Sequence, residues 1–296
     1  MANILLTGGA GFIGSHLTER LINDGNKVTI IDNLSTGKRE NIDPRAEFFN
    51  ADISDFETMK PLFKNKEVVF HVAAIPSVPR SIENPKASFE ANIMGTLHVL
   101  LAARDCGVRR VIYSASSSAY GNQESLPLRE IFAPNPLSPY AISKLVGEQL
   151  CRQFTNLYGL DTISLRYFNV YGPRMNEGAY AAVVATFLKQ RKAGKPLTIC
   201  GDGNQRRDFT YVSDVVEANA RAMNIKRAGG EVVNIGAGDS HTIRELAEFV
   251  GGEVISMPER PGEIKESLAD IAKAKKILDW EPKVSLKEGI EGLLSA

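Results

Sequence analysis

Two residues near the middle of the chain, Tyr140 and Lys144, have side chains that could move a proton. They lie four residues apart, after Ser138 and Pro139, which are typical of a helix N-terminus, so both face one side of the predicted helix. A free phenol has a pKa of about 10, but a nearby ammonium favours the phenolate. The pair is a candidate for general base chemistry, although Tyr and Lys at this spacing are often only surface neighbours.

A glycine-rich segment, Thr7–Gly14, lies between the first apolar run and the first helical pattern. Gly8 permits a tight turn, Gly11 lets the backbone approach a pyrophosphate, and Gly14 allows close packing of helix on strand. The free amides of the helix N-terminus favour an anion. The spacing is G-x-x-G-x-x-G and not the commoner G-x-G-x-x-G, but its strand–turn–helix context predicts a dinucleotide-binding site.

Two aspartates end later apolar runs, and both suit the adenosine half of a dinucleotide. Asp32 follows Gly14 by 18 residues. Its carboxylate can accept hydrogen bonds from ribose hydroxyls and would repel a 2′-phosphate, which favours NAD over NADP. Asp52 holds a similar position after the third run and could reach the adenine. For each of them, and for Asp52 above all, an ordinary strand-end aspartate is the alternative.

A hydroxyl-rich segment, Ser114–Gly121, ends the fifth apolar run. Hydroxyls at the carboxyl end of a parallel strand point toward the crevice where the cofactor is expected. One of them could hydrogen-bond a substrate oxygen and pass on a proton. The alternative is a serine-rich turn that only terminates the strand.

The elements that must position these residues alternate between strands and helices. Continuous apolar runs, typical of a parallel sheet covered on both faces, predict strands at residues 3–6, 27–31, 47–49, 68–72, 110–113 and 161–165. Helical patterns cover residues 12–24, 56–64, 85–106 and 139–158. The alternation predicts an α/β fold with a Rossmann-type doubly wound parallel sheet.

The pattern loosens after Tyr167, where turns separate shorter helical patterns at 180–193, 213–225, 242–250 and 270–278. A further apolar run near 231–236 could return to the first sheet. We therefore expect a cofactor domain at 1–170 and a smaller, interleaved C-terminal substrate-binding lobe at 171–296. Ligands of such sheets bind at the carboxyl ends of the strands, which here face that lobe.

Composition excludes several classes of protein. The 296 residues carry 35 Lys+Arg and 35 Asp+Glu, so no net positive charge draws the chain to nucleic acid or anionic lipid. The odd number of cysteines, three, and the lack of short metal-ligand spacing between them argue against a disulfide scaffold or a zinc site. No apolar run approaches the roughly 20 residues of a membrane span, and the N-terminus lacks the basic region of a signal peptide. These features predict a cytoplasmic protein with no membrane, nucleic-acid or metal partner.

The motifs together resemble one family. Thr7–Gly14, Ser116, Tyr140-x-x-x-Lys144 and Arg166–Asn169 follow the order and spacing of the extended short-chain dehydrogenase/reductases, and most resemble the nucleotide-sugar 4-epimerases among them. The resemblance covers essentially the whole chain. It implies Tyr140 as base, Lys144 as its electrostatic partner and ribose ligand, and Ser116 as third member. Ser116 is chosen by its distance from the family's closing Tyr-Gly, here Tyr120-Gly121.

The same resemblance implies NAD as cofactor and a homodimer through helices 85–106 and 139–158. The implied cofactor contacts are Gly8, Gly11, Phe12, Ile13, Gly14, Asp32, Asn33, Asp52, Ile53, Ala73, Ala74, Asn92, Tyr140, Lys144 and Phe168.

Differences from relatives point to the reaction. Nucleotide-sugar 4,6-dehydratases carry Asp-Glu directly after the triad hydroxyl, whereas this chain has Ser117 and Ser118, which are poor proton donors and acceptors at neutral pH. UDP-glucuronate decarboxylases carry a Glu near this site, and it is absent here. The resemblance thus implies epimerisation at C4 through a transient 4-keto sugar with tightly bound NAD. The alternatives are a net dehydrogenase, reductase, dehydratase or decarboxylase of the same family, and an NAD-sensing binding protein.

The second half offers residues for the substrate. Asn169, Arg207 and Arg260 match family contacts to the diphosphate, although any single arginine is more often a surface residue. Two stretches resemble those of the subgroup of enzymes that acts on UDP-N-acetylhexosamines. The candidate substrate residues in these stretches are Ser77, Arg80, Tyr180, Ala182 and Val183. Ser267 matches a gate position where a bulky tyrosine restricts the pocket of glucose/galactose enzymes. We therefore expect UDP-Glc and UDP-Gal as substrates, together with UDP-GlcNAc and UDP-GalNAc.

Overall fold

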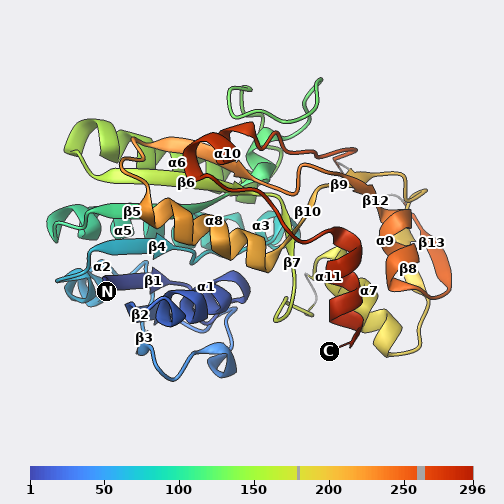
Figure 1. Ribbon diagram of the computed structural model, residues 1–296, viewed down its shortest axis with the longest axis horizontal. Helices are drawn as coiled ribbons and strands as arrows, with labels where there is room; N and C mark the ends of the chain where they lie inside the picture. The colour runs from blue at the N-terminus through green and yellow to red at the C-terminus, as the bar shows by residue number, and fades with distance from the viewer. Residues whose placement is uncertain (179–180, 259–263, 296) are drawn as a thin grey trace.

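A seven-stranded parallel sheet forms the centre of the computed structural model, which describes residues 1–178, 181–258 and 264–295 (Figure 1). The strand order is β11 (Glu231–Ile235), β6 (Asp161–Tyr167), β5 (Arg110–Ser116), β4 (Val68–His71), β1 (Asn3–Thr7), β2 (Lys27–Asp32) and β3 (Glu47–Asn50). The order runs outward from β1 in both directions, which is the doubly wound topology expected from the sequence. The fold-class prediction is confirmed. β11 reaches the sheet after a long excursion and pairs with β6 in parallel.

Helices cover both faces of this sheet. One face carries α1 (Phe12–Asn23), α8 (Val212–Asn224) and α10 (Ala272–Leu278), and the other carries α2 (Phe56–Met59), α5 (Gly95–Asp105) and α6 (Pro139–Tyr158). Alternate strand residues point to opposite faces, so Ile4 and Leu6 join the first apolar core while Leu5 joins the second. The continuous apolar runs of the sequence follow from this two-sided burial.

Several predicted helices differ in detail from the observed ones. The pattern at 85–106 is helical throughout, but it consists of α4 (Pro85–Phe89), a π-helical turn (Glu90–Met94) and α5. The pattern at 56–64 changes after α2 into a 3-10 turn (Lys60–Phe63), because Pro61 has no N–H to donate. The sequence reading missed α3 (Val78–Glu83), α11 (Leu286–Ser295) and two 3-10 turns at Arg39–Asn41 and Ser117–Tyr120.

A smaller lobe follows β6 and gathers at one end of the sheet, on the right in Figure 1, where the chain also ends. It holds α7 (Val183–Lys192), α9 (Ile243–Val250) and α11 around an apolar core of its own. Three two-stranded pairs complete it: β7 (Asn169–Tyr171) with β10 (Phe209–Tyr211), β9 (Arg206–Arg207) with β12 (His241–Thr242), and β8 (Leu197–Cys200) with β13 (Val254–Met257). Among the described residues, no helix combines the length and apolar character needed to cross a membrane.

Candidate active site

A cavity of about 500 Å³ opens where the carboxyl ends of β1, β2, β4 and β5 meet the first turns of α1 and α6. It brings together residues that are far apart in the sequence. The predicted cofactor residues that line it are Gly8, Gly11, Phe12, Ile13, Gly14, Asp32, Asn33, Asp52, Ile53, Ala73, Ala74, Tyr140 and Lys144. This is the edge of a doubly wound sheet at which ligands bind.

The glycine turn keeps the start of α1 close to the sheet. Gly8 has φ +80°, and a Cβ on it would lie 2.6 Å from the backbone nitrogen of Ala73. A Cβ on Gly14 would lie 2.0 Å from the carbonyl oxygen of Gly8. The first turn of α1 contains no acidic side chain. Its N-terminal amides therefore face the cavity without a competing carboxylate and fit the pyrophosphate of a dinucleotide.

Asp32 is held rigidly at the end of β2. Its Oδ2 accepts the N–H of Ala10 at 2.9 Å, and its Oδ1 accepts the N–H of Leu34 at 2.8 Å. Burial raises the pKa of Asp32, and these two bonds oppose the rise. Asn33 donates from Nδ2 to Oδ2 of Asp52 at 2.7 Å, which joins the two strand ends. The residues present therefore fit an adenosine with free ribose hydroxyls.

Tyr140 and Lys144 project from the first two turns of α6. Ser138 caps this helix by accepting the N–H of Ala141 at 3.1 Å. The Nζ of Lys144 donates to the carbonyl oxygen of Ser114 at 2.7 Å and lies 5.0 Å from the ring centroid of Tyr113. These contacts fix the lysine between α6 and the end of β5, beside the cavity.

The pKa of the phenol shifts in the direction opposite to the one predicted from Lys144. Burial raises the pKa of Tyr140, and a hydrogen bond with Ser116 opposes the rise. Burial also lowers the pKa of Lys144 to about 8, while Glu148 acts to raise it. In the protein without cofactor, loss of water penalises the phenolate more than the polar neighbours favour it. The lowering expected when a positively charged cofactor ring lies beside Tyr140 stays a prediction.

Three of the predicted catalytic and cofactor residues are not among the described residues that line the cavity. Ser116 ends β5, and its Oγ accepts the hydroxyl of Ser118 at 2.8 Å. Asn92 is buried, donates to Ser143 Oγ at 3.0 Å and accepts the N–H of Ile75 at 2.8 Å, so it supports the cavity wall from behind. Phe168 is buried against the ring of Tyr120.

The predicted substrate residues fall into separate groups. Asn169 Nδ2 lies 3.4 Å from Ser267 Oγ, and Arg207 lies in β9 directly before Asp208, whose carbonyl oxygen also accepts from Asn169. Ser77 caps α3 by accepting the N–H of Arg80 at 3.2 Å. Ala182 and Val183 begin α7, and no described contact joins them to Asn169 or Ser267. Tyr180 and Arg260 lie outside the described residues.

Sequence reasoning missed Arg174, which lines the same cavity. Its backbone has φ +66°, and its guanidinium donates to Glu19 on α1 at 2.5 Å. The available signal was a cation directly after the turn formed by Gly172 and Pro173. The cavity also includes Ser35, Lys38, Ser54, Met175 and Asn176.

Known proteins are similar to this chain in sequence and in structure. The sequence profile of the NAD dependent epimerase/dehydratase family matches residues 4–236. A putative UDP-glucose 4-epimerase of Methanocaldococcus jannaschii is 42% identical over 300 residues, covering 99% of this chain and 97% of that protein. Two solved structures are also similar over 99% of this chain. They are Thermotoga maritima UDP-glucose 4-epimerase with UDP-glucose (41% identity, 97% of that chain, TM-score 0.96) and Methanobrevibacter ruminantium UDP-N-acetylglucosamine 4-epimerase with UDP-N-acetylmuramic acid (38%, 98%, 0.92).

Proposed function

Because the chain belongs to the NAD dependent epimerase/dehydratase family, we propose that it interconverts UDP-glucose with UDP-galactose, and UDP-GlcNAc with UDP-GalNAc. At the level of the family it is an NAD-dependent UDP-sugar epimerase of the extended short-chain dehydrogenase/reductase type. The observation that carries the proposal is that Tyr140 and Lys144 share one cavity with the Gly8–Gly14 turn and Asp32.

We assign the cofactor to that cavity. The amides at the start of α1 would hold the pyrophosphate, Asp32 would accept the adenosine ribose hydroxyls, and Asp52 would contact the adenine. Lys144 binds the second ribose. NAD, when bound, supplies a reversible acceptor for the hydride of C4. The domain at 1–170 and the strand at 231–235 build this half of the site, and the lobe at 171–296 holds the nucleotide sugar.

Tyr140 takes the proton of the C4 hydroxyl and returns it in the reverse step. Ser116 donates a hydrogen bond to the same oxygen, and the Lys144 ammonium favours the phenolate. Burial raises the pKa of Tyr140, and the positive charge of an oxidised cofactor, when bound, would oppose that rise. The 4-keto sugar then turns about its bond to the diphosphate, which Asn169, Arg207 and Arg260 hold.

The side chains after Ser116 support epimerisation over elimination. A dehydratase needs a base for the C5 proton and an acid for the C6 hydroxyl. Ser117 and Ser118 supply neither at neutral pH, and Ser118 donates its hydroxyl to Ser116 at 2.8 Å. The sugar is therefore oxidised and reduced at C4 without loss of a group.

The choice of sugar rests on Ser267 and on the stretches that contain Ser77, Arg80, Tyr180, Ala182 and Val183. Ser267 is 8% exposed, and its hydroxyl accepts from Asn169 at 3.4 Å. A serine at this position is smaller than a tyrosine by a whole phenol ring. We infer that the space admits an N-acetyl group.

A coupled assay of the purified protein on UDP- and dTDP-sugars tests the proposal. We expect turnover of both UDP pairs without added NAD, because the cofactor is regenerated in each cycle. Stoichiometric NADH or a 4-keto-6-deoxy product would establish the dehydrogenase or dehydratase alternative. Tyr140→Phe should abolish turnover while NAD remains bound. Unchanged turnover of that variant would refute Tyr140 as the base.

We further propose a cytoplasmic homodimer through the helices at 85–106 and 139–158. Apolar side chains exposed on α6 support it, since Ile142, Leu157 and Tyr158 are 40%, 68% and 52% exposed. Light scattering should give the mass of two chains, and a monomer at micromolar concentration would contradict the proposal.

A further inference from the structure

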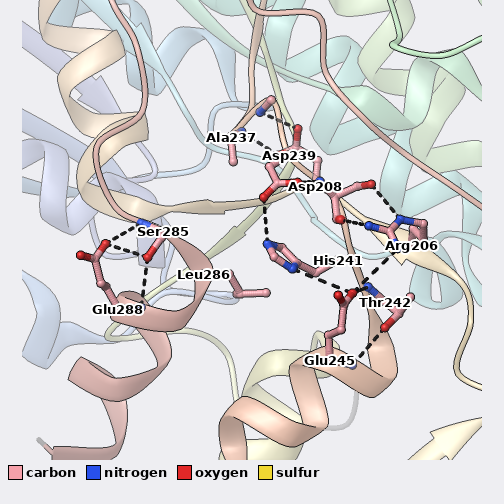
Figure 2. A network of polar contacts seen from close by, with 12 residues as sticks. Arg206, Asp208, Ala237, Asp239, His241, Thr242, Glu245, Ser285, Leu286 and Glu288 are labelled. Atoms are coloured by element: carbon pink, nitrogen blue, oxygen red, sulfur yellow. Dashed lines mark hydrogen bonds and ion pairs between the residues drawn. The ribbon is translucent and has the colours of Figure 1, made fainter.

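Asp208 lies in the smaller lobe between β9 and β10 and is completely buried. Its Oδ1 accepts the N–H of Ala237 at 2.6 Å, and its Oδ2 accepts the N–H groups of Gly238 at 3.0 Å and Ala269 at 3.1 Å. Thr210 donates its hydroxyl to Oδ1 at 3.3 Å. A buried carboxylate is costly, and the hydrogen bonds from these backbone amides offset part of that cost. Figure 2 shows Asp208 and Ala237 above the polar contacts of Arg206, His241 and Glu245.

The donors come from two distant segments of the chain. Ala237 and Gly238 follow β11, the last strand of the main sheet, and Ala269 lies in a segment that bridges to Leu128. The approach is close, because a Cβ on Gly236 would lie 2.9 Å from Oδ2 of Asp208. The carboxylate therefore ties the main sheet and the 267–269 segment to the start of β10.

The backbone of Asp208 contacts the residues that we assign to the substrate. Its N–H donates to Ser267 Oγ at 3.5 Å, and its carbonyl oxygen accepts from Asn169 Nδ2 at 3.0 Å. β10 pairs with β7 so that Phe209 lies opposite Asn169. Arg207 is the preceding residue. Residue 208 thus contacts Asn169 and Ser267 through its backbone and directly follows Arg207 in the chain.

The opposite side of β9 is anchored as well. Successive strand residues point to opposite faces, so Arg206 projects away from Arg207. Its guanidinium donates to the hydroxyl of Ser240 at 3.0 Å and lies 3.9 Å from Glu245 on α9 (Figure 2). β9 is thus held on one side by Arg206 and by its pairing with β12, and at its end by the bonds of Asp208.

We propose that Asp208 is a positioning residue for the UDP end of the substrate. This proposal rests on the function proposed above. Its carboxylate fixes the segments around Ala237 and Ala269. Its backbone holds Asn169, which we assign to the diphosphate, and Ser267, which we assign to the sugar. The site is thereby assembled before the substrate arrives, and less of the binding energy is lost in ordering it.

Asp208→Asn tests this, because the amide keeps the size of the side chain while placing an NH2 group among backbone donors. We expect the KM for UDP-galactose and the Kd for UDP to rise about tenfold or more. A tenfold rise in Kd corresponds to a loss of about 1.4 kcal/mol of binding free energy. The kcat should stay within about threefold and bound NAD should be unchanged, because neither depends on β9.

Asp214 provides the matched control. It is also a buried aspartate, and its Oδ2 accepts the N–H groups of Lys283 and Val284 at 3.1 Å each, in contact with neither Asn169 nor Ser267 among the described bonds. Asp214→Asn should lower the melting temperature without raising KM or the Kd for UDP. Equal effects of the two substitutions on these constants would overturn the proposal, since they would show only a structural role.

Thr210→Val keeps the test decisive if Asp208→Asn does not fold. It removes one donor to the carboxylate, and we expect a rise of about threefold in the Kd for UDP with NAD retained. An unchanged Kd for UDP in every folded variant contradicts the positioning role alone. UDP binding by a wild-type protein that turns over no UDP-sugar contradicts the epimerase function alone. Absence of UDP binding by the wild type contradicts both.

Discussion

The cofactor cavity and the proposed UDP site are built in different ways. The cavity gathers the carboxyl ends of adjacent strands, so the register of one sheet fixes Gly8, Asp32 and Ala73 relative to one another. The proposed UDP site gathers short segments outside the main sheet, and the hydrogen bonds of Asp208 join them. The difference suggests that the first site resists the loss of any one polar bond, whereas the second depends on a single carboxylate.

The largest effect should come from a substitution that adds a side chain in the glycine turn. In Gly14→Ala the new methyl group would lie 2.0 Å from the Gly8 carbonyl oxygen, so α1 must move away from the sheet. We expect loss of bound NAD and a decrease of about 1–3 kcal/mol in the free energy of unfolding. Measurements of NAD per chain and of urea unfolding check this.

Gly292→Ala is the corresponding control in α11. No atom lies within 4 Å of a Cβ at this position, and alanine favours a helix over glycine by up to about 1 kcal/mol. The variant should keep NAD and be slightly more stable. Full retention of NAD by Gly14→Ala would contradict the role of the close approach.

Lys144→Met should lower kcat about 100-fold or more, because it removes the ammonium while leaving a side chain of similar length. Burial lowers the pKa of Lys144 to about 8. The kcat of the wild type should therefore fall as the pH rises above about 8 and the ammonium is lost. A pH profile of both proteins tests this, and an identical alkaline limb in Lys144→Met would exclude the lysine as its cause.

Asp208 should make the protein less stable as the pH rises from about 4 to 6. Burial raises the pKa of Asp208 to about 6, above its ordinary value of 3.8, so the folded chain binds the proton more tightly than the unfolded chain. Protonated Asp208 stabilises the folded chain fully at pH values below the pKa of this group in the unfolded chain. This stabilisation, about 3 kcal/mol, is lost as the pH rises through the pKa of Asp208 in the folded chain. Urea unfolding at both pH values should show this loss in the wild type and not in Asp208→Asn. A parallel pH dependence of the two proteins would assign it to other groups.

Ser267→Tyr should give the smallest effect, a change of selectivity. We expect turnover of UDP-GlcNAc to fall about tenfold or more, while turnover of UDP-glucose stays within about threefold. The melting temperature serves as a control, because Ser267 is buried. No turnover of the acetylated pair by the wild type would refute the proposed breadth of substrates.

The cofactor half could be predicted from the sequence because its signals are local. The Gly8–Gly14 spacing, the strand-end position of Asp32 and the four-residue spacing of Tyr140 and Lys144 each follow from the geometry of one element. Two-sided burial made the strands visible as continuous apolar runs.

The substrate half could not be predicted to the same depth because its geometry depends on distant pairs. No pattern in the sequence predicts that the carboxylate of Asp208 accepts hydrogen bonds from Ala237 and Ala269. Strands of two residues, such as β9, are too short to show a periodic pattern. The direction of the pKa shift at Tyr140 also required the structure, because it depends on burial.

The most direct test of the central claim follows the hydrogen at C4. UDP-galactose labelled with deuterium at C4 should give UDP-glucose that keeps the label at C4, with no added NAD. Tyr140→Phe, with NAD bound, should give no labelled product. Exchange of the label with solvent, or recovery of a dehydrated sugar, would contradict reversible oxidation at C4 in the cavity that Tyr140 lines.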